Sequence, residues 1–294
     1  MFLCQPLVEV LVGRGIEDVD AFLKVPSWSD LPDPFSIPSM GQAVDRVLRA
    51  VERNERIAIF GDYDCDGVLA THILQIVLRD LRTTARIYLP HRDEGYGLNS
   101  SVIHDFSCSG TDLLIAVDNG INARSAVHLG HRLGIDVLVI DHHRIQEGAE
   151  VVAVWSPEFC GAGLATIFAW ALLTRAGWRD SRLECLLLKC SQYAAIASIA
   201  DCVPLLGATR ALTKIGLAEL GRTGHAGVRE LLKSGCADAA HPDSHDVAFG
   251  IAPRLNAAGR LAHPSLALQV FEAQTEEDAH QSVDRLNELN LERR

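Results

Sequence analysis

The chain has 294 residues, of which 48% are hydrophobic and 22% are charged, and its 27 Lys and Arg against 38 Asp and Glu give a formal net charge of −11. This composition is typical of a globular protein and excludes the disordered, collagen-like and coiled-coil classes. The negative charge, taken alone, argues against a nucleic-acid-binding protein, because such proteins generally carry a basic surface.

Apolar, β-branched segments alternate with helical patterns in the first half of the chain. Arg56–Phe60 is typical of a buried strand and follows a segment with helical spacing, Met40–Arg53. Long helices are expected over Val68–Leu81 and Ala123–Leu133. The further strands expected are Ala85–Leu89, Asp112–Val117, Ile135–Ile140 and Val151–Trp155. This alternation predicts βαβ units, and therefore an α/β fold with a doubly wound, mostly parallel sheet.

From Gly163 onward the pattern is helical. The helices expected there are Ala165–Ala176, Leu183–Ala200, Thr209–Leu220 and Gly227–Lys233. The last helix, Thr275–Arg294, has a predicted N-cap at Thr275 followed by three acidic residues. We therefore divide the chain into a lead-in (1–55), a parallel α/β core (56–160), a helical part (161–274) and the start of a connector helix (275–294).

The cysteines and the N-terminal sequence indicate in which cellular compartment the protein is expected. None of the eight cysteines forms a C-x-x-C pair, so we expect no structural zinc site. The N-terminus lacks a charged segment before an apolar core, and no apolar run reaches about 18 residues. We expect a cytoplasmic protein with reduced thiols, without a signal peptide or a membrane span.

Acidic residues follow three of the predicted strands. Asp62, Asp64 and Asp66 follow the first strand, Asp118 follows the third, and the sequence Asp-His-His at 141–143 follows the fourth. Open α/β sheets bind ligands beyond the carboxyl ends of their strands. Two carboxylates about 4 Å apart repel by about 4 kcal/mol at an effective dielectric constant near 20. We therefore expect protonation or bound cations there, and an oxygen-rich set with imidazole favours Mn²⁺ over Mg²⁺ or Zn²⁺.

Other interpretations were weighed for the same residues. The first acidic segment matches the opening of an EF-hand calcium loop, but position 12 is Ile73 instead of Glu, and a strand precedes the loop. A turn of solvated acids, or a histidine pair without a ligand, would explain a single motif. Three motifs at successive strand ends argue against both. The glycine-rich dinucleotide motif, the P-loop and the G-x-S-x-G elbow are absent from the sequence.

Four motifs carry a resemblance to a known family. They are Gly61–Gly67 (GDYDCDG), Val117–Gly120 (VDNG), Asp141–His143 (DHH) and Ala200–Leu205 (ADCVPL). Together they resemble the DHH phosphoesterase superfamily. Three more segments are similar to its RecJ family of single-strand-specific exonucleases, namely Glu94–Leu98, Gly161–Gly163 and Pro253–Leu261.

The resemblance implies a two-metal phosphodiesterase that removes mononucleotides from single-stranded DNA in the 5′→3′ direction, in DNA repair and recombination. It implies Mn²⁺, with Mg²⁺ as the second choice. The implied metal ligands are Asp62, Asp64, Asp66, Asp118, His142 and Asp201. As catalytic residues we expect His143 to meet the phosphate and Asp118 to bridge the two cations. Asp141 is expected either as a further metal ligand or as a partner that orients a histidine, and the second role is favoured. The expected nucleic-acid and phosphate contacts are Arg92, Tyr96, Arg254, Asn256 and Arg260, with the last three on a loop.

The chain also departs from complete RecJ-like enzymes. We recognise no DHH-associated C-terminal domain and no OB-fold after the last helix, and Cys65 replaces the usual alanine of the first motif. Two alternatives therefore stay open. One is a phosphodiesterase for short oligonucleotides or cyclic dinucleotides, and the other is a non-catalytic nucleic-acid-binding scaffold. For the main hypothesis we expect a monomer that acts on single-stranded DNA away from membranes, with repair or replication proteins as candidate partners.

Overall fold

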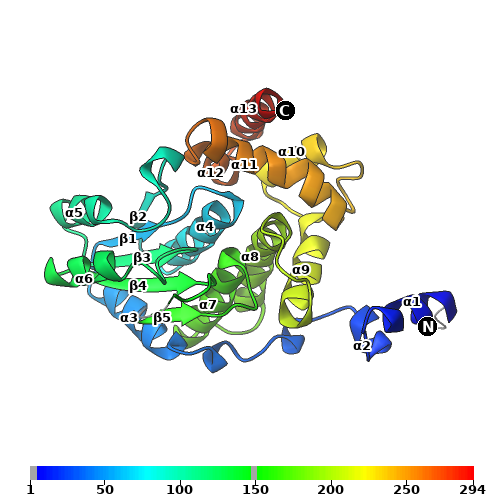
Figure 1. Ribbon diagram of the computed structural model, residues 1–294, viewed down its shortest axis with the longest axis horizontal. Helices are drawn as coiled ribbons and strands as arrows, with labels where there is room; N and C mark the ends of the chain where they lie inside the picture. The colour runs from blue at the N-terminus through cyan, green and yellow to red at the C-terminus, as the bar shows by residue number, and fades with distance from the viewer. Residues whose placement is uncertain (1–4, 147–150) are drawn as a thin grey trace.

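The computed structural model describes residues 5–146 and 151–294, and a five-stranded sheet with only parallel pairings forms its centre (Figure 1). The strand order is β2-β1-β3-β4-β5. The strands are β1 (Ile57–Phe60), β2 (Ala85–Tyr88), β3 (Leu113–Val117), β4 (Asp136–Asp141) and β5 (Ala153–Trp155). The predicted α/β class and all five predicted strands are confirmed. The strand order reverses between β1 and β3, and such a reversal opens the crevice in which α/β sheets bind ligands.

Helices cover both faces of the sheet, which explains why its strands are apolar throughout. On one face, Ala58 and Phe60 of β1 belong to a core cluster with α5 (Ser100–Cys108) and α6 (Arg124–Arg132). On the other face, Ile57 and Ile59 belong to the main core cluster. The helices on that face are α3 (Met40–Glu52), α4 (Cys65–Asp80) and α7 (Gly161–Arg175).

The second half of the described chain is helical, as predicted. In Figure 1 its first helices lie beside the sheet, at the centre of the picture, and its later helices lie above. Its helices are α8 (Asp180–Ala200), α9 (Gly207–Leu220), α10 (Ala226–Gly235), the π-helix η4 (Asp246–Ile251), α11 (Ala252–Leu261), α12 (Ser265–Glu272) and α13 (Glu276–Arg293). The Thr275 hydroxyl accepts a hydrogen bond from the Asp278 amide at 3.1 Å, so the predicted N-cap is confirmed. Helix α8 is long and apolar enough to cross a membrane, but 67% of that window is buried inside the protein, as in a core helix.

One sequence prediction about this part was wrong. Residues 254–260 were expected as a loop, but they lie within α11. The π-helix η4 runs directly into α11, and Pro253 stands in the first turn of α11, where its missing N–H costs no hydrogen bond. The alanines and Leu255 that follow are good helix formers.

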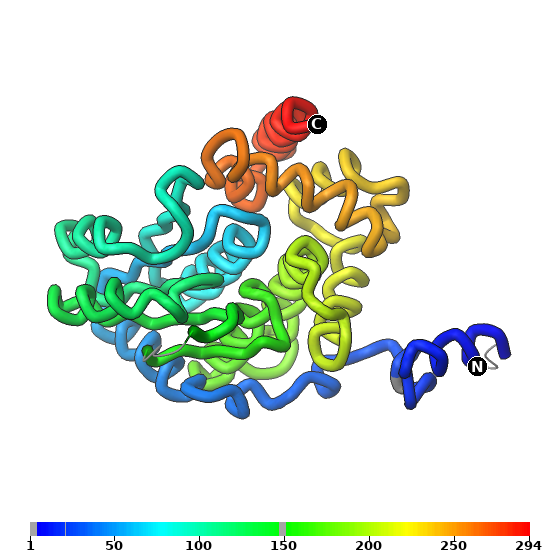
Figure 2. The backbone as a smooth tube through the Cα atoms, in the orientation of Figure 1, coloured from blue at the N-terminus to red at the C-terminus, as the bar shows by residue number. Residues whose placement is uncertain are grey.

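The N-terminal helices α1 (Gln5–Gly13) and α2 (Val19–Leu23) project from the body of the protein (Figure 2). Short 3-10 helices follow in the lead-in and after β2, namely η1 (Trp28–Asp30), η2 (Pro34–Ser36) and η3 (Arg92–Glu94). The seven cysteines within the described residues are unpaired. Residues 1–4 of the predicted lead-in, which include Cys4, lie outside the described residues. Residues 147–150 of the predicted α/β core lie outside them as well.

Candidate metal centre

The first acidic motif connects β1 to α4. Asp64 is the N-cap of α4, and its Oδ1 accepts hydrogen bonds from the amides of Asp66 and Gly67, each at 3.0 Å. Such a cap satisfies backbone donors that the first turn of a helix leaves free. The same geometry fixes the direction in which Asp64 presents its other oxygen.

Asp66 is held from a different part of the chain, the N-terminus of α7. Its Oδ2 accepts from the Gly161 amide at 2.6 Å, and its Oδ1 accepts from the Ala162 amide at 2.7 Å. A side chain at position 161 would not fit, since a Cβ there would lie 2.6 Å from the Cβ of Asp118. The glycine motif at 161–163 therefore acts on the acids through close backbone approach, a role that the sequence analysis did not assign.

Two of the motifs contain a residue with left-handed backbone. Asp118, directly after β3, has a φ of +61°, and Cys202, directly after Asp201, has a φ of +58°. For a residue other than glycine this conformation costs about 1 kcal/mol or more, and it clusters at functional sites because surrounding contacts must enforce it. Both turns aim a carboxylate into the same cluster.

His142 lies among three of the carboxylates. Its Nε2 is 3.1 Å from Asp118 Oδ1, 3.6 Å from Asp66 Oδ2 and 3.8 Å from Asp201 Oδ2. The carboxylates come from the ends of β3 and α8 and from the start of α4, so the fold gathers four separate motifs at one point.

The predicted ligands form two groups in which the ligand atoms all lie within 4.8 Å of one another. One group is Asp66, His142 and Asp201, and the other is Asp62, Asp64 and Asp118. The structure thus brings together all six residues that the sequence analysis named as metal ligands. Two groups of three are the arrangement that a pair of cations would need.

Burial and mutual repulsion make this cluster costly without cations. Burial, then the charge of Asp64, raise the pKa of Asp62 to about 7, and burial, then Asp66, raise that of Asp201 to about 7. Burial and the neighbouring acids also raise the pKa of Asp118 well above its ordinary value. These shifts show that the acids cannot all stay ionised without a counter-charge.

The residues present fit divalent cations. Asp62 Oδ1 is buried and has no hydrogen-bond partner among the residues that the structure describes. Five carboxylates with one imidazole form a hard, oxygen-rich donor set, which suits Mn²⁺ and Mg²⁺ better than Zn²⁺.

Asp141 is placed to orient His143. Its Oδ1 lies 2.7 Å from His143 Nδ1 and accepts from the amides of His142 and His143, while its Oδ2 accepts from the Ile121 amide at 2.9 Å. Burial alone would raise the pKa of Asp141, but these hydrogen bonds, led by that from His143, lower it. The same bond raises the pKa of His143, in spite of burial. With its oxygens occupied in this way, Asp141 is a partner for His143 and does not belong to either group of three.

Two aromatic residues complete the surroundings of His143. The Tyr96 hydroxyl lies 3.1 Å from His143 Nε2 and donates to the Asp118 carbonyl at 3.3 Å. The Trp155 indole donates to the His143 carbonyl at 2.7 Å. Tyr96 was predicted as a nucleic-acid contact and lies in the site. Trp155 was missed, because a tryptophan at a strand end carries no signal of what its N–H will meet.

The arginines expected at phosphates lie in different environments. Arg92 is exposed, and its guanidinium lies over the Tyr63 ring, 5.3 Å from the centroid. Tyr63 belongs to the segment 61–64 that connects β1 to α4, which we call the acidic loop. Arg260 is exposed near the end of α11. Arg254 donates instead to Asn287 Oδ1 at 2.7 Å, to the Ser234 carbonyl at 2.8 Å and to the Gly250 carbonyl. Its donors are therefore committed to joining α10, η4 and α13.

Helix α11 also supports the acidic loop directly. Asn256 Oδ1 accepts a hydrogen bond from the Cys65 amide at 2.8 Å, across 191 positions of sequence. A Cβ at Gly259 would lie 2.2 Å from the Tyr63 carbonyl oxygen, so the helix and the loop are in backbone contact. Asn256 thus has a structural partner inside the site.

The comparisons with known proteins point to the same family as the sequence motifs. The family model for the DHH family, N-terminal domain, matches residues 56–198. The single-stranded-DNA-specific exonuclease RecJ of Bacillus subtilis (strain 168) is 34% identical, over 98% of this chain and 37% of the relative. The protein of the same name from Dickeya dadantii (strain 3937) is 35% identical, over 96% of this chain and 52% of the relative. The chain therefore spans about half or less of the length of these curated relatives.

Solved structures show the same likeness. RecJ in complex with Mn²⁺ from Thermus thermophilus superposes with a TM-score of 0.80 at 29% identity, over 96% of this chain and 41% of the other. A structure of exonuclease RecJ bound to manganese has a TM-score of 0.80 at 31% identity, over 90% of this chain and 67% of the other. Both solved proteins share the fold over at least 90% of the present chain.

Proposed function

Because the chain belongs to the DHH family, with RecJ exonucleases among its relatives, we propose that it is the core of a metal-dependent phosphodiesterase that hydrolyses single-stranded DNA from the 5′ end. The observation that carries this proposal is the pair of three-residue groups, Asp66–His142–Asp201 and Asp62–Asp64–Asp118. The two groups meet where His142 Nε2 lies 3.1 Å from Asp118 Oδ1. A scaffold protein would gain nothing from burying so many acids, since their repulsion lowers its stability.

The two groups are the proposed ligands of two divalent cations, Mn²⁺ by preference, with Mg²⁺ as a substitute. When bound, such cations supply a water of lowered pKa and neutralise the charge that develops on phosphate oxygens. Asp118 is the proposed bridging ligand, since it belongs to one group and its Oδ1 lies 3.1 Å from the histidine of the other.

The remaining steps fall to side chains of this chain. The hydrogen bond from His143 Nδ1 to Asp141 favours the protonated ring, so Nε2 also carries a proton. Nε2 lies 3.1 Å from the Tyr96 hydroxyl, and we propose that a non-bridging phosphate oxygen replaces this hydroxyl as its acceptor. Asp141 and the Trp155 indole hold the ring and its backbone in place. Tyr96, whose hydroxyl reaches His143 and whose ring is half exposed, is the proposed contact for a nucleotide next to the scissile bond.

Arg92 and Arg260 are the proposed phosphate contacts along the strand, because both are exposed and close to the acidic loop or to α11, which supports it. Arg254 and Asn256 are proposed to act on DNA indirectly. Arg254 fixes the position of α11 through its bond to Asn287, and Asn256 fixes the end of the acidic loop through the Cys65 amide. We expect the protein to act as a monomer in the cytoplasm, with repair or replication proteins as candidate partners.

The test is release of mononucleotides from 5′-labelled single-stranded DNA of 20 nucleotides in the presence of Mn²⁺. Activity should vanish with EDTA and in Asp118→Asn, and a Gln281→Met control on exposed α13 should behave as wild type. A parallel reaction on a dinucleotide and a cyclic dinucleotide separates the RecJ-like activity from a small-substrate one. Hydrolysis of the short substrates alone would contradict the proposal, as would 20-mer release that persists in Asp118→Asn.

A further inference from the structure

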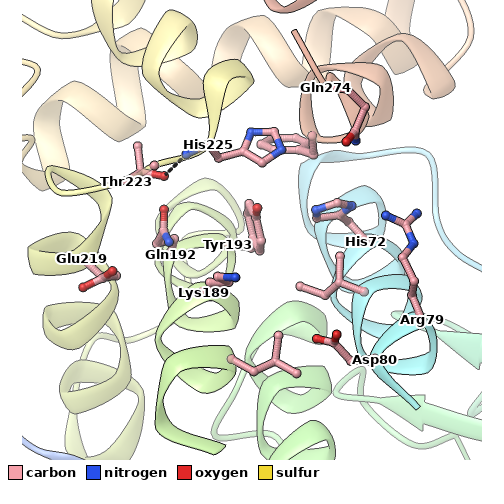
Figure 3. A pocket seen from close by; sticks show the side chains of 14 residues that line it. His72, Arg79, Asp80, Lys189, Gln192, Tyr193, Glu219, Thr223, His225 and Gln274 are labelled. Carbon is pink, nitrogen blue, oxygen red and sulfur yellow. Dashed lines mark hydrogen bonds between the residues drawn. The ribbon is translucent and has the colours of Figure 1, made fainter. Parts of the chain in front are cut away.

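We propose that a second cavity, outside the metal centre, binds a nucleoside monophosphate. The cavity has a volume of about 540 Å³ and lies between α4, α8, the connection from α9 to α10, and α12 (Figure 3). That volume is within the range of small-molecule sites, roughly 300 to 1,000 Å³. No step proposed for phosphodiester cleavage uses it.

Two buried polar side chains that line the cavity each carry one atom without a hydrogen-bond partner in the described part of the chain. His72 and Gln192 are only 3% and 4% exposed, and His72 Nδ1 and Gln192 Oε1 have no hydrogen-bond partner within residues 5–146 and 151–294. Figure 3 shows Gln192 and His72 on opposite sides of Tyr193. Their two unpaired atoms have almost no accessible surface, so a ligand would reach them after each side chain turns toward the cavity. An unpaired buried polar atom costs about 1 to 3 kcal/mol, so a ligand that supplies the missing partners recovers that cost on binding.

The chemistry of these two groups calls for a heterocycle with both donors and acceptors on its edge. Burial lowers the pKa of His72 to about 3, so its ring is neutral at ordinary pH, with one nitrogen that donates and one that accepts. Gln192 Oε1 accepts only. A nucleobase, with amino groups and ring nitrogens side by side, matches this pattern.

The wall beside these groups is aromatic, with rings packed edge to face. The rings of His72, Tyr193 and Phe271 contact one another, with centroids 4.8 to 5.6 Å apart, and Ile76 and Leu186 extend the apolar surface. Such a surface receives the face of a planar ring, whose burial stabilises the complex.

Charged groups line the rest of the cavity. Arg79 on α4 and Lys189 on α8 are exposed and form no ion pair in the described part of the chain, so both are available to a phosphate. Asp80 and Glu219 also line the cavity, and they can accept from the hydroxyl groups of a sugar. The cavity thus offers polar side chains for a base, carboxylates for a sugar and two cationic side chains for one phosphate. This combination favours a nucleoside monophosphate over inorganic phosphate or a free base.

The cavity is separate from the metal centre but shares two helices with it. His72 and Arg79 lie six and thirteen residues after Asp66 on α4, about 9 and 20 Å along the helix axis. Lys189 lies twelve residues before Asp201, at the end of α8, about 18 Å away. A ligand between these helices would contact the elements that carry metal ligands at their other ends.

Isothermal titration calorimetry with EDTA present tests the proposal independently of catalysis. The probes are dAMP, dGMP, dCMP, dTMP and AMP, with inorganic phosphate as the comparison. We expect saturable one-to-one binding of at least one nucleotide and none of phosphate. Gln192→Met should weaken binding about tenfold, the loss of one buried hydrogen bond. Lys189→Ala should weaken it about two- to fivefold, as for an exposed charge. Asp118→Asn and Gln281→Met should bind as wild type.

Three results would overturn the inference. They are the absence of binding at millimolar nucleotide, binding that both cavity variants leave unchanged, and binding that disappears in Asp118→Asn, which would place the ligand at the metal centre. Lys189 is exposed, so its variant reports on the cavity even if Gln192→Met fails to fold. Because no cleavage occurs in EDTA, the result stands whether or not the proposed nuclease activity is found.

Discussion

Replacing Gly259 by alanine should damage the metal centre from a distance. In the interior of an exposed helix, alanine is more favourable than glycine by about 0.5 to 1 kcal/mol. At this position of α11, however, the added Cβ would lie 2.2 Å from the Tyr63 carbonyl oxygen, so the helix or the acidic loop must move. Overpacking of this kind costs about 1 to 3 kcal/mol. We therefore expect Gly259→Ala to lower the free energy of unfolding, by up to about 2.5 kcal/mol after the helix preference is subtracted.

The matched control is Gly41→Ala in α3, where the nearest atom to a new Cβ is Arg175 Nη2 at 3.8 Å. We expect this variant to be as stable as wild type or up to about 1 kcal/mol more stable. Both variants are compared by urea unfolding at equilibrium and by calorimetric titration with Mn²⁺. Since Tyr63 stands between Asp62 and Asp64, Gly259→Ala should also weaken Mn²⁺ binding, by about tenfold or more. If Gly259→Ala gains stability as Gly41→Ala does and binds Mn²⁺ as wild type, α11 does not brace the acidic loop.

Three further predictions concern His143 and the cavity. In Asp141→Asn the new amide nitrogen must face a backbone N–H, which is also a donor. We expect the free energy of unfolding, measured with urea, to fall by about 1 to 3 kcal/mol and kcat to fall about 10- to 100-fold. An unchanged kcat would contradict the orienting role. Trp155→Phe removes the hydrogen bond to the His143 carbonyl and should lower kcat about three- to tenfold, with Mn²⁺ affinity by calorimetry unchanged. His72 stays neutral in the native state but gains a proton on unfolding below pH 6.5, so stability should fall as pH falls from about 6.5 toward 3. Between pH 7 and 4.5 the free energy of unfolding of wild type, measured by urea titration, should fall by about 2 to 3 kcal/mol more than that of His72→Gln. Equal losses would refute the burial of a neutral ring.

The sheet and the position of the acids could be predicted from the sequence because both depend on local patterns. Segments such as Ile57–Phe60 are apolar at every position, which only a strand covered on both faces requires. The acids that follow β1, β3 and β4 then meet because parallel strands present their carboxyl ends at the same edge of the sheet. The prediction needed no knowledge of which side chains touch.

The parts that were missed depend on contacts between distant segments. Nothing near Asn256 indicates that its side chain will bond the Cys65 amide, and nothing near Gly161 indicates that its amide will hold Asp66. Residues 254–260 were expected as a loop because arginines and a glycine there match a motif, whereas the helix arises from continuation of η4. The cavity around His72 was also missed, since an apolar helix interrupted by one histidine is usually core.

The net charge of −11 is a poor guide to nucleic-acid binding in this protein, because the acids are unevenly placed. Asp62, Asp66, Asp118 and Asp141 are at most 4% exposed, so they contribute little to the field that an approaching DNA strand meets at the surface. Two bound divalent cations would cancel four of the eleven excess negative charges at the one place where phosphate must come close. Binding of DNA should therefore depend on prior binding of metal more steeply than in a protein with a basic groove.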